Sequence, residues 1–179
     1  MVGEVHTPIP CKPGKPARID DEYVRNGVAQ FFMEVEPLAG KRRVAITERR
    51  TRKDWAHQIK EMLDIRYPGA IKIRLVMDHL NTHNIASLHE TFPPAEARRL
   101  AERLEIHFTS KHGSWLNRAE IEFSALKGQC LDRRMPDMAT VQTEVETWER
   151  HRNNDPTPAN WQFTTKDARI MLKKLYPNL

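Results

Sequence analysis

Asp78 is the acidic residue best placed for chemistry in this sequence. It ends the segment IKIRLVMD, in which apolar and polar residues alternate as in a β-strand, and it begins DHLNTH, which adds Asn81 and His83. Open α/β sheets place ligand and metal groups at the ends of their strands. An aspartate in this position also commonly caps the loop that leaves a strand, and the sequence weighs the two roles equally.

Glu120 lies in a second segment, HFTSKHGSWLNRAEIEF (residues 107–123), where it has two possible roles. Asn117 and Glu120 have the spacing of a helix N-cap and the residue that bonds back to it. On a helical wheel, Glu120 and Glu122 each lie roughly 80° from the centre of the apolar stripe, so periodicity does not separate them. Either glutamate can line a cleft beside the core.

Carboxylates from a strand end and a helix form a hard-oxygen site when a fold brings them together. Such a site suits Mg²⁺ or Mn²⁺. Two of these ions about 4 Å apart activate the attacking oxygen and stabilise the leaving oxygen in phosphodiester chemistry. Three or more carboxylates usually share this work, and the residues alone identify two.

Other residues are weaker candidates. His83, His107 and His112 can contact phosphate or orient a ligand, but scattered histidines are more often surface residues. Trp115 offers a stacking platform for a base, although a tryptophan beside a helix start is more often part of a core. The segment GKRRVAITERRTRK (residues 40–53) holds seven basic residues, which can follow a DNA backbone or protect a strand edge.

Length and composition indicate one folded domain of 179 residues, with 39% hydrophobic and 30% charged residues. No apolar run approaches the roughly 20 residues of a membrane helix. The N-terminal residues lack a secretory signal, so we expect a cytoplasmic protein.

The net charge of +5 favours a polyanionic partner such as nucleic acid without proving one. Cys11 and Cys130 follow no metal or redox spacing, which predicts two reduced thiols.

The pattern of elements predicts a mixed α/β fold in the order β-β-α-β-α-β-α-α-α. The expected elements are a proline-rich arm over residues 1–20, a hairpin of residues 27–36 and 42–48, a helix from Thr51 to the stop at Pro68–Gly69, a strand over 71–78, a helix over 94–104, a strand over 105–110, a helix over 114–131, and helices around 141–148 and 168–175. No internal repeat accompanies them. Asp78 thus ends a strand, and Glu120 lies on a helix.

Three stretches carry a family resemblance: VMDHLNTH (76–83), FTSKHGSWLNRAEIEFSALKGQCLDRR (108–134) and FTTKDARIMLKKLYP (163–177). Together they resemble the catalytic domain of bacterial insertion-sequence DDE transposases of the mariner superfamily, over residues 2–177. The resemblance implies a ribonuclease-H-like fold, with a central mixed sheet flanked by helices. In that fold an Asp, Asp, Glu triad holds two divalent ions. Such transposases cleave DNA at transposon ends and join the freed 3′ hydroxyl to target DNA.

Carried over position by position, the resemblance makes Asp78 the second carboxylate of the triad and Glu120 the third. Both are then catalytic residues and ligands of Mg²⁺ or Mn²⁺. The residues expected to contact DNA are Lys111, His112, Trp115, Asn117 and Arg118. The implied partners are transposon ends and target DNA, with full-length transposase or a second copy of the chain as a protein partner, and the implied location is the bacterial cytoplasm and nucleoid.

The sequence departs from the family pattern at several points. His79 stands where the family usually has Asn, and Ser110 where it has Pro. The first Asp of the triad lies in the family upstream of a segment resembling GEVHTPIP (residues 3–10), and neither its strand nor a helix-turn-helix region is recognised here. We therefore expect a single domain over residues 1–179 that acts as an inactive or split transposase fragment.

Two alternatives remain open from the sequence. One is a non-enzymatic DNA-binding remnant that interferes with a full-length transposase. The other is a stand-alone ribonuclease-H-like nuclease that recruits Glu122 or Glu36 as a further carboxylate.

Overall fold

A computed structural model describes residues 1–109, 117–160, 162, 164–171 and 173. Its elements are β1 (Val2–Glu4), β2 (Tyr23–Arg25), β3 (Gln30–Glu36), β4 (Lys41–Thr47), α1 (Arg52–Glu61), β5 (Ile73–Met77), α2 (Ile85–Thr91), α3 (Pro94–Glu102), β6 (Leu104–Phe108), α4 (Arg118–Leu126), α5 (Met138–Asn154) and α6 (Thr165–Met171). Single π-helical turns continue α1 through Met62–Arg66 (η1) and α4 through Lys127–Leu131 (η3). The mixed α/β class is confirmed.

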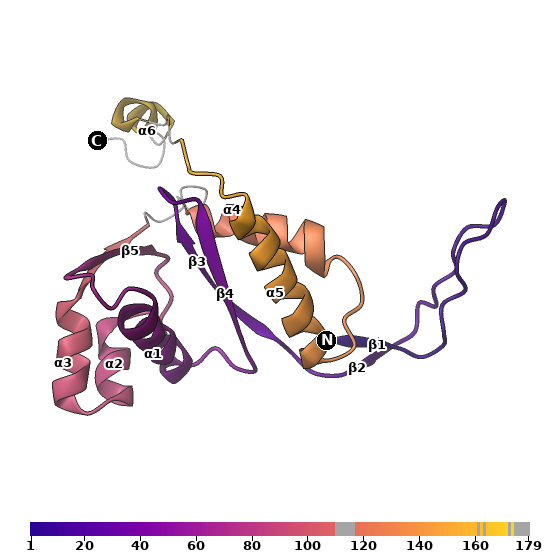
Figure 1. Cartoon of the computed structure of the whole chain (residues 1–179), viewed down its shortest axis with the longest axis horizontal. Coiled ribbons are helices and arrows are strands. Elements are labelled where there is room, and N and C mark those ends of the chain that lie inside the picture. Colours follow the sequence, from indigo (N-terminus) through magenta and orange to yellow (C-terminus); the bar gives the residue numbers. More distant parts are fainter. Residues whose placement is uncertain (110–116, 161, 163, 172, 174–179) are drawn as a thin grey trace.

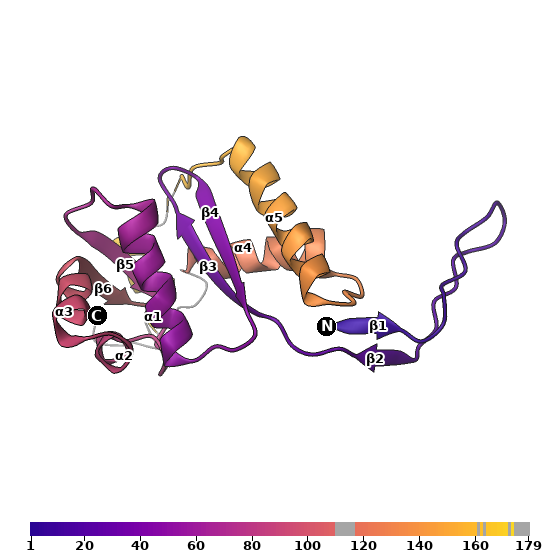
Figure 2. The same cartoon turned by 60° about the horizontal axis from the view of Figure 1, so that its bottom comes forward.

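The hairpin of β3 and β4 stands at the centre of the molecule (Figures 1 and 2). Its strands pair antiparallel, with Phe32 opposite Ala45 and Met33 opposite Val44. Successive side chains point to opposite faces of a strand, so these two pairs lie on opposite faces of the hairpin. Gly40 closes the turn with φ 65°, where a Cβ would lie 2.5 Å from the backbone of Thr157. The predicted hairpin is confirmed.

One face of the hairpin packs against a group of buried residues that we call the first core. Its members are Phe32, Ala45, Trp55, Ala56, Ile59, Met62, Leu63, Met77, Leu88, Ala97, Leu100 and Leu104. They come from α1, η1, α2 and α3 as well as from the strands. At the start of α1, Thr51 and Asp54 form the expected capping box, which satisfies backbone N–H groups that the helix leaves unbonded.

The opposite face of the hairpin packs against a second core. Its members are Val44, Leu126, Cys130, Met135, Val141, Val145 and Trp148. They come from β4, α4, η3, α5 and the segment between η3 and α5, and the indole of Trp148 donates to Gln129 Oε1 at 2.9 Å. Helices therefore cover the hairpin on both faces, α1 to α3 on one and α4 with α5 on the other.

The strands of the described residues form three separate two-stranded sheets, β1–β2, β3–β4 and β5–β6. The predicted single central mixed sheet is wrong for this part of the chain, because β3 bonds only to β4 and β5 only to β6. β5 and β6 run parallel, and Met77 lies opposite Phe108. On β5, Leu75 packs on the first core, whereas Val76 on the other face is 56% exposed.

Contacts at the two ends of β5 give its direction relative to the hairpin. Arg66, which precedes β5, binds Glu34 near the end of β3 at 2.5 Å. The ring of His83, which follows β5, lies 6.2 Å from the ring of Phe32 near the start of β3. β5 therefore runs opposite to β3, and Asp78 lies at the end where β3 begins and β4 finishes.

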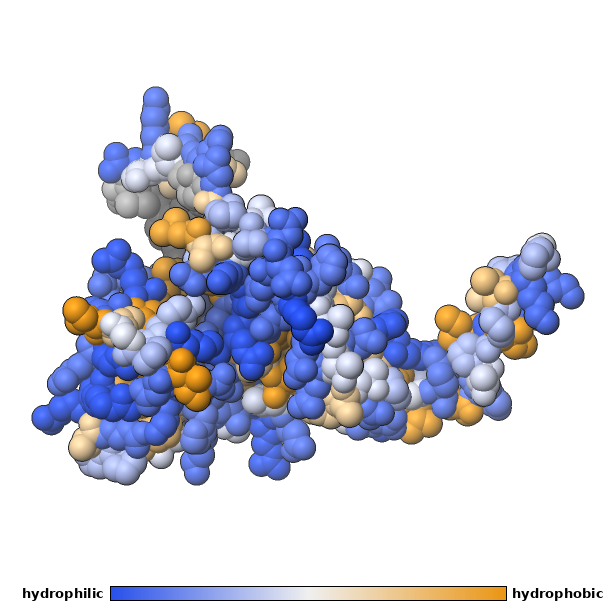
Figure 3. Space-filling view, in the orientation of Figure 1, coloured by the Kyte–Doolittle hydropathy of each residue, from blue (hydrophilic) through white to orange (hydrophobic). Residues whose placement is uncertain are grey.

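The N-terminal segment forms the predicted arm, which projects from the body (Figure 1). Isolated bridges join Ile9 to Arg18 and Lys12 to Lys15, and Gly14 turns the chain with φ 76°. The arm exposes apolar side chains beside polar ones (Figure 3). Within the described residues, no helix has the length and apolar character needed to cross a membrane.

Candidate functional site

Asp78 follows Met77, the last residue of β5, as the sequence predicts. The end of the strand is held in place because the Thr109 N–H donates to the Met77 carbonyl at 2.9 Å. The Asp78 side chain is 53% exposed, and its Oδ1 lies 3.3 Å from Nδ1 of His83. Within the described residues it has no Lys or Arg partner, so its charge is not neutralised.

The His83 ring lies against the first core beside Asp78. It stacks on Trp55 with ring centroids 5.9 Å apart and an interplanar angle of 23°. Its Nε2 is buried and has no hydrogen-bond partner among the described residues. Burial lowers the pKa of His83, and the nearby Asp78 carboxylate opposes that effect only in part. Burial thus favours the neutral form of the imidazole.

Glu120 lies in the first turn of α4, two residues after the helix begins. Asn117 is the N-cap, as predicted, and its side chain accepts from the Ala119 N–H at 3.1 Å. The predicted return bond from Glu120 is not part of this cap. Glu120 is exposed, and its carboxylate has no ion pair with a described residue. Like Asp78, it is an open carboxylate.

Glu122 differs from Glu120 in burial and in ion pairing, two properties that decide whether a carboxylate is available to a metal. Its side chain is 2% exposed, and its Oε2 lies 3.1 Å from Nε of Arg42 and 3.2 Å from Nη2 of Arg152. Its Oε1 lies 3.4 Å from Nη2 of Arg118. These arginines come from β4, α5 and α4, so the cluster ties three elements together. We call Glu122, Arg42, Arg118 and Arg152 the buried ion cluster.

The buried ion cluster corrects one sequence expectation. A carboxylate that is enclosed by three arginines cannot also bind a divalent cation, so Glu122 is not a spare metal ligand. Glu36, the other spare carboxylate, accepts from the Tyr67 hydroxyl at 3.1 Å. It lies at the end of β3 that is remote from Asp78. The structure therefore gives no support to a nuclease that recruits either residue.

The buried ion cluster was not predicted, although the sequence carries a signal for it. In β4, Arg42 alternates in phase with Val44, which faces the second core. A charged residue at an inward position implies a buried partner. The guanidinium also donates to the carbonyls of Arg152 at 2.8 Å and Gly40 at 2.9 Å.

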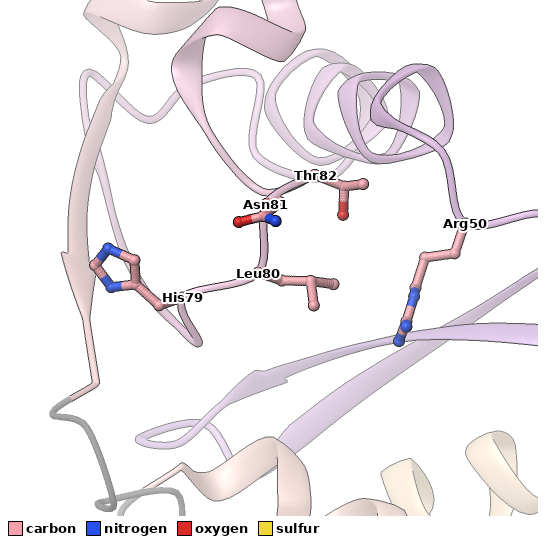
Figure 4. A pocket seen from close by; sticks show the side chains of 5 residues that line it. All are labelled: Arg50, His79, Leu80, Asn81 and Thr82. Carbon is pink, nitrogen blue, oxygen red and sulfur yellow. The ribbon is translucent and has the colours of Figure 1, made fainter.

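An open pocket of about 240 Å³ is lined by the loop that directly follows Asp78 in the chain (Figure 4). Its lining residues are Arg50, His79, Leu80, Asn81 and Thr82. Arg50 precedes α1 and faces the loop of residues 79–82 across the pocket (Figure 4). The His79 ring, at the position where the family usually has Asn, packs on Phe108 with centroids 4.2 Å apart.

The structure describes two of the five residues predicted to contact DNA. Lys111, His112 and Trp115 lie outside the described residues. Asn117 caps α4, and Arg118 belongs to the buried ion cluster. Neither role requires DNA, and both fix the start of the helix that carries Glu120.

The basic segment of residues 40–53 does not form one continuous charged face. Arg42 is buried, and Arg43 binds Glu149 at 3.3 Å. Arg49 and Arg50 are exposed at the end of the hairpin nearest Asp78. Lys41 and Lys53 are exposed too, so only part of the positive charge of this segment lies beside the pocket. Both cysteines are free, as predicted.

Among the residues that the structure describes, Asp78 and Glu120 do not belong to a preformed three-ligand group. Within the described residues, the side chains whose ligand atoms lie within 4.8 Å of one another are His6, Asp20 and Glu22, on the arm. The residues left undescribed include no Asp or Glu. The two candidate carboxylates fit a hard divalent cation by their chemistry, since both are exposed and neither has a Lys or Arg partner among the described residues, but the described chain adds no third carboxylate to them.

The chain connects the two carboxylates through β6. Phe108 lies opposite Met77, next to Asp78, and the segment that follows leads to Asn117 at the start of α4. Asp78 thus lies at the edge of the first core, and Glu120 lies on a helix that packs into the second.

Residues 2–142 match the family described as DDE superfamily endonuclease, a span that includes both Asp78 and Glu120. No curated protein and no solved structure matches the chain.

Proposed function

Since this chain belongs to the DDE superfamily endonucleases, we propose that it is the catalytic domain of a transposase of the mariner type. The reaction is metal-dependent cleavage of DNA at transposon ends, followed by transfer of the freed 3′ end to target DNA. One observation carries the proposal: Asp78 and Glu120 are exposed carboxylates without a cationic partner among the described residues, while Glu122, in the same helix as Glu120, is fully neutralised.

In this proposal Asp78 and Glu120 hold Mg²⁺ or Mn²⁺. Carboxylate oxygens are the ligands that these ions prefer. When bound, the ions supply activation of the attacking oxygen and stabilisation of the leaving oxygen. The chain leaves both carboxylates exposed, Asp78 at a strand end and Glu120 in a helix whose start is fixed by Asn117 and Arg118.

DNA is the proposed partner, and the pocket beside Asp78 is its proposed point of contact. Arg50 lines that pocket, and Arg49 lies next to it in the sequence. A guanidinium binds phosphate oxygens with two parallel hydrogen bonds, which positions a strand without reading its sequence. A phosphodiester held by Arg50 lies within the pocket that adjoins Asp78.

The fold expected for this function is ribonuclease-H-like. Helices on both faces of the hairpin and a carboxylate at the end of a parallel strand support it. A protein partner, either a full-length transposase or a second copy of the chain, belongs to the same proposal.

A second candidate function is DNA binding without cleavage. The observation in its favour is that the described chain offers two open carboxylates at the site and no third. A metal held by two carboxylates has fewer anionic ligands than phosphodiester chemistry usually employs. A chain of this kind competes for transposon DNA with a complete enzyme.

The test is nicking of a supercoiled plasmid by the purified chain with Mn²⁺. The first function predicts nicking that Asp78→Asn or Glu120→Gln abolishes and that Asp132→Asn and Glu146→Gln, which replace exposed residues without ion pairs among the described residues, leave intact. Salt-sensitive plasmid binding without nicking supports the second function. Nicking that survives both site substitutions contradicts the assignment of Asp78 and Glu120.

A further inference from the structure

We propose that His83 is a positioning residue for Asp78. Its Nδ1–H donates to Oδ1 of Asp78, which fixes the carboxylate and leaves Oδ2 free for a divalent cation. This inference rests on the proposed function, because it concerns the same site. It assigns the site a residue that acts through Asp78 and does not touch the metal.

The tautomer follows from the surroundings of the two ring nitrogens. A neutral imidazole carries one N–H, and the nitrogen that bears it is set by the available acceptors. Nε2 is buried without a partner among the described residues, and an unpaired buried N–H costs about 1–3 kcal/mol. Nδ1 faces a carboxylate oxygen at 3.3 Å. The proton therefore belongs on Nδ1.

Packing holds the ring in this orientation. The imidazole stacks on Trp55 and lies beside Phe32, and only 16% of the His83 side chain is exposed. A ring fixed between two aromatic neighbours loses little further freedom when it binds Asp78. The donor is thus preorganised, as second-shell groups of metal sites commonly are.

The backbone on both sides of His83 is also fixed. The His83 N–H donates to the Leu80 carbonyl at 2.8 Å. After it, Asn84 caps α2 by accepting from the Ser87 N–H at 3.1 Å, and the Ser87 hydroxyl donates to the Thr82 carbonyl at 2.9 Å. The loop from Asp78 to α2 is therefore a closed turn that presents His83 to Asp78.

The same contacts exclude two other roles for His83. Nδ1 is engaged by Asp78, and Nε2 points into buried surroundings, so neither nitrogen is open to a metal. For the same reason the ring cannot exchange protons with a substrate at the surface of the pocket. What remains is the hydrogen bond to Asp78.

The first test reads the tautomer without metal or DNA. The ¹⁵N shifts of the His83 ring, assigned by their loss in His83→Phe, are expected to show the Nδ1–H tautomer at neutral pH. Asp78→Ala is expected to remove that preference. An Nε2–H tautomer in the unsubstituted chain, or a tautomer that Asp78→Ala leaves unchanged, overturns the inference whatever the Mn²⁺ affinities are.

The second test measures Mn²⁺ affinity by electron paramagnetic resonance. All variants carry His6→Ala, which removes a ligand from the three-residue group on the arm. His83→Phe keeps an aromatic ring beside Trp55 and removes the donor, so Mn²⁺ affinity is expected to fall about 10–100-fold. His83→Asn, which restores a donor, is expected to recover part of the loss.

His57→Phe is the matched control, because His57 is an exposed histidine of α1 that packs edge-on against Phe92, with ring centroids 5.2 Å apart, and belongs to no part of the proposed site. It is expected to bind Mn²⁺ like the parent. Equal affinity in His83→Phe and the parent overturns the inference. If the parent itself shows no Mn²⁺ binding that depends on Asp78, the metal site of the proposed function fails, and the tautomer measurement still decides the role of His83.

Discussion

The two cores of this protein place carboxylates in opposite states. At the edge of the first core, Asp78 is exposed and touches the imidazole of His83. Inside the second core, Glu122 is buried and shared by three arginines. Glu120 lies in the same helix as Glu122 yet belongs with Asp78, because it faces solvent. Of these two glutamates of α4, Glu122 thus stabilises the fold and Glu120 is a candidate metal ligand.

The largest expected effect comes from breaking the buried ion cluster. Glu122→Gln leaves the buried Arg42 without its carboxylate and is expected to lower the free energy of unfolding by about 3–5 kcal/mol. Urea denaturation followed by circular dichroism measures the change. Glu120→Gln is the matched control and is expected to stay within about 0.5 kcal/mol of the parent. Equal losses in the two variants would show that the two glutamates do not differ as described.

A substitution that creates a cavity tests how tightly the first core is packed. Leu88 of α2 is fully buried, and Leu88→Ala is expected to lower the free energy of unfolding by about 2–5 kcal/mol. Ile71→Ala, which changes a side chain that is 92% exposed, serves as the control and is expected to have little effect. A small loss at Leu88 in the same urea experiment would mean that α2 is not part of the core.

Helix caps are expected to contribute less to the free energy of unfolding than the buried residues of either core. Asp137 caps α5 of the second core by accepting from the Thr140 N–H at 2.7 Å. Asp137→Ala is expected to lower the free energy of unfolding by about 1 kcal/mol. Asp132→Ala, at an exposed position before the helix, is expected to be neutral. Thermal unfolding with both variants checks the difference, and identical melting temperatures would contradict the cap.

The smallest expected effect is a pH dependence of the free energy of unfolding, which comes from Asp64 of η1, beside the first core. Hydrogen bonds from Arg99 hold the pKa of Asp64 below its ordinary value. Because the pKa is lower in the folded state, the stabilisation is present at neutral pH and is lost as the pH falls through the folded pKa. Asp64→Asn is expected to flatten the acid side of the stability curve slightly, since the pair is partly exposed and screened by salt. An unchanged acid limb would contradict the effect.

Local signals in the sequence predicted much of this fold. The hairpin, α1 with its capping box, β5 ending before Asp78, and the cap at Asn117 all follow from patterns within a few residues. The seven-residue helix α2 was missed, although Asn84 supplied a cap signal. The pairing of β1 with β2 was also missed, because the arm separates the two strands in the sequence.

The site was harder to predict than the fold. Helical periodicity could not separate Glu120 from Glu122, because the difference is made by Arg42 and Arg152, which are distant in the sequence. The expected central sheet is divided into separate pairs, since strand pairing depends on contacts that alternation does not encode. The role of His83 depends on its packing against Trp55, which no motif shows.

The central claim is that Asp78 and Glu120 hold the same metal ion. Its most direct test is Mn²⁺ titration by electron paramagnetic resonance in the His6→Ala background, comparing Asp78→Asn, Glu120→Gln and the double variant. A shared ion predicts that each single substitution removes the same bound Mn²⁺, and that the double variant loses nothing more. Mn²⁺ binding that neither substitution changes, or two losses that add as independent sites, would contradict the claim.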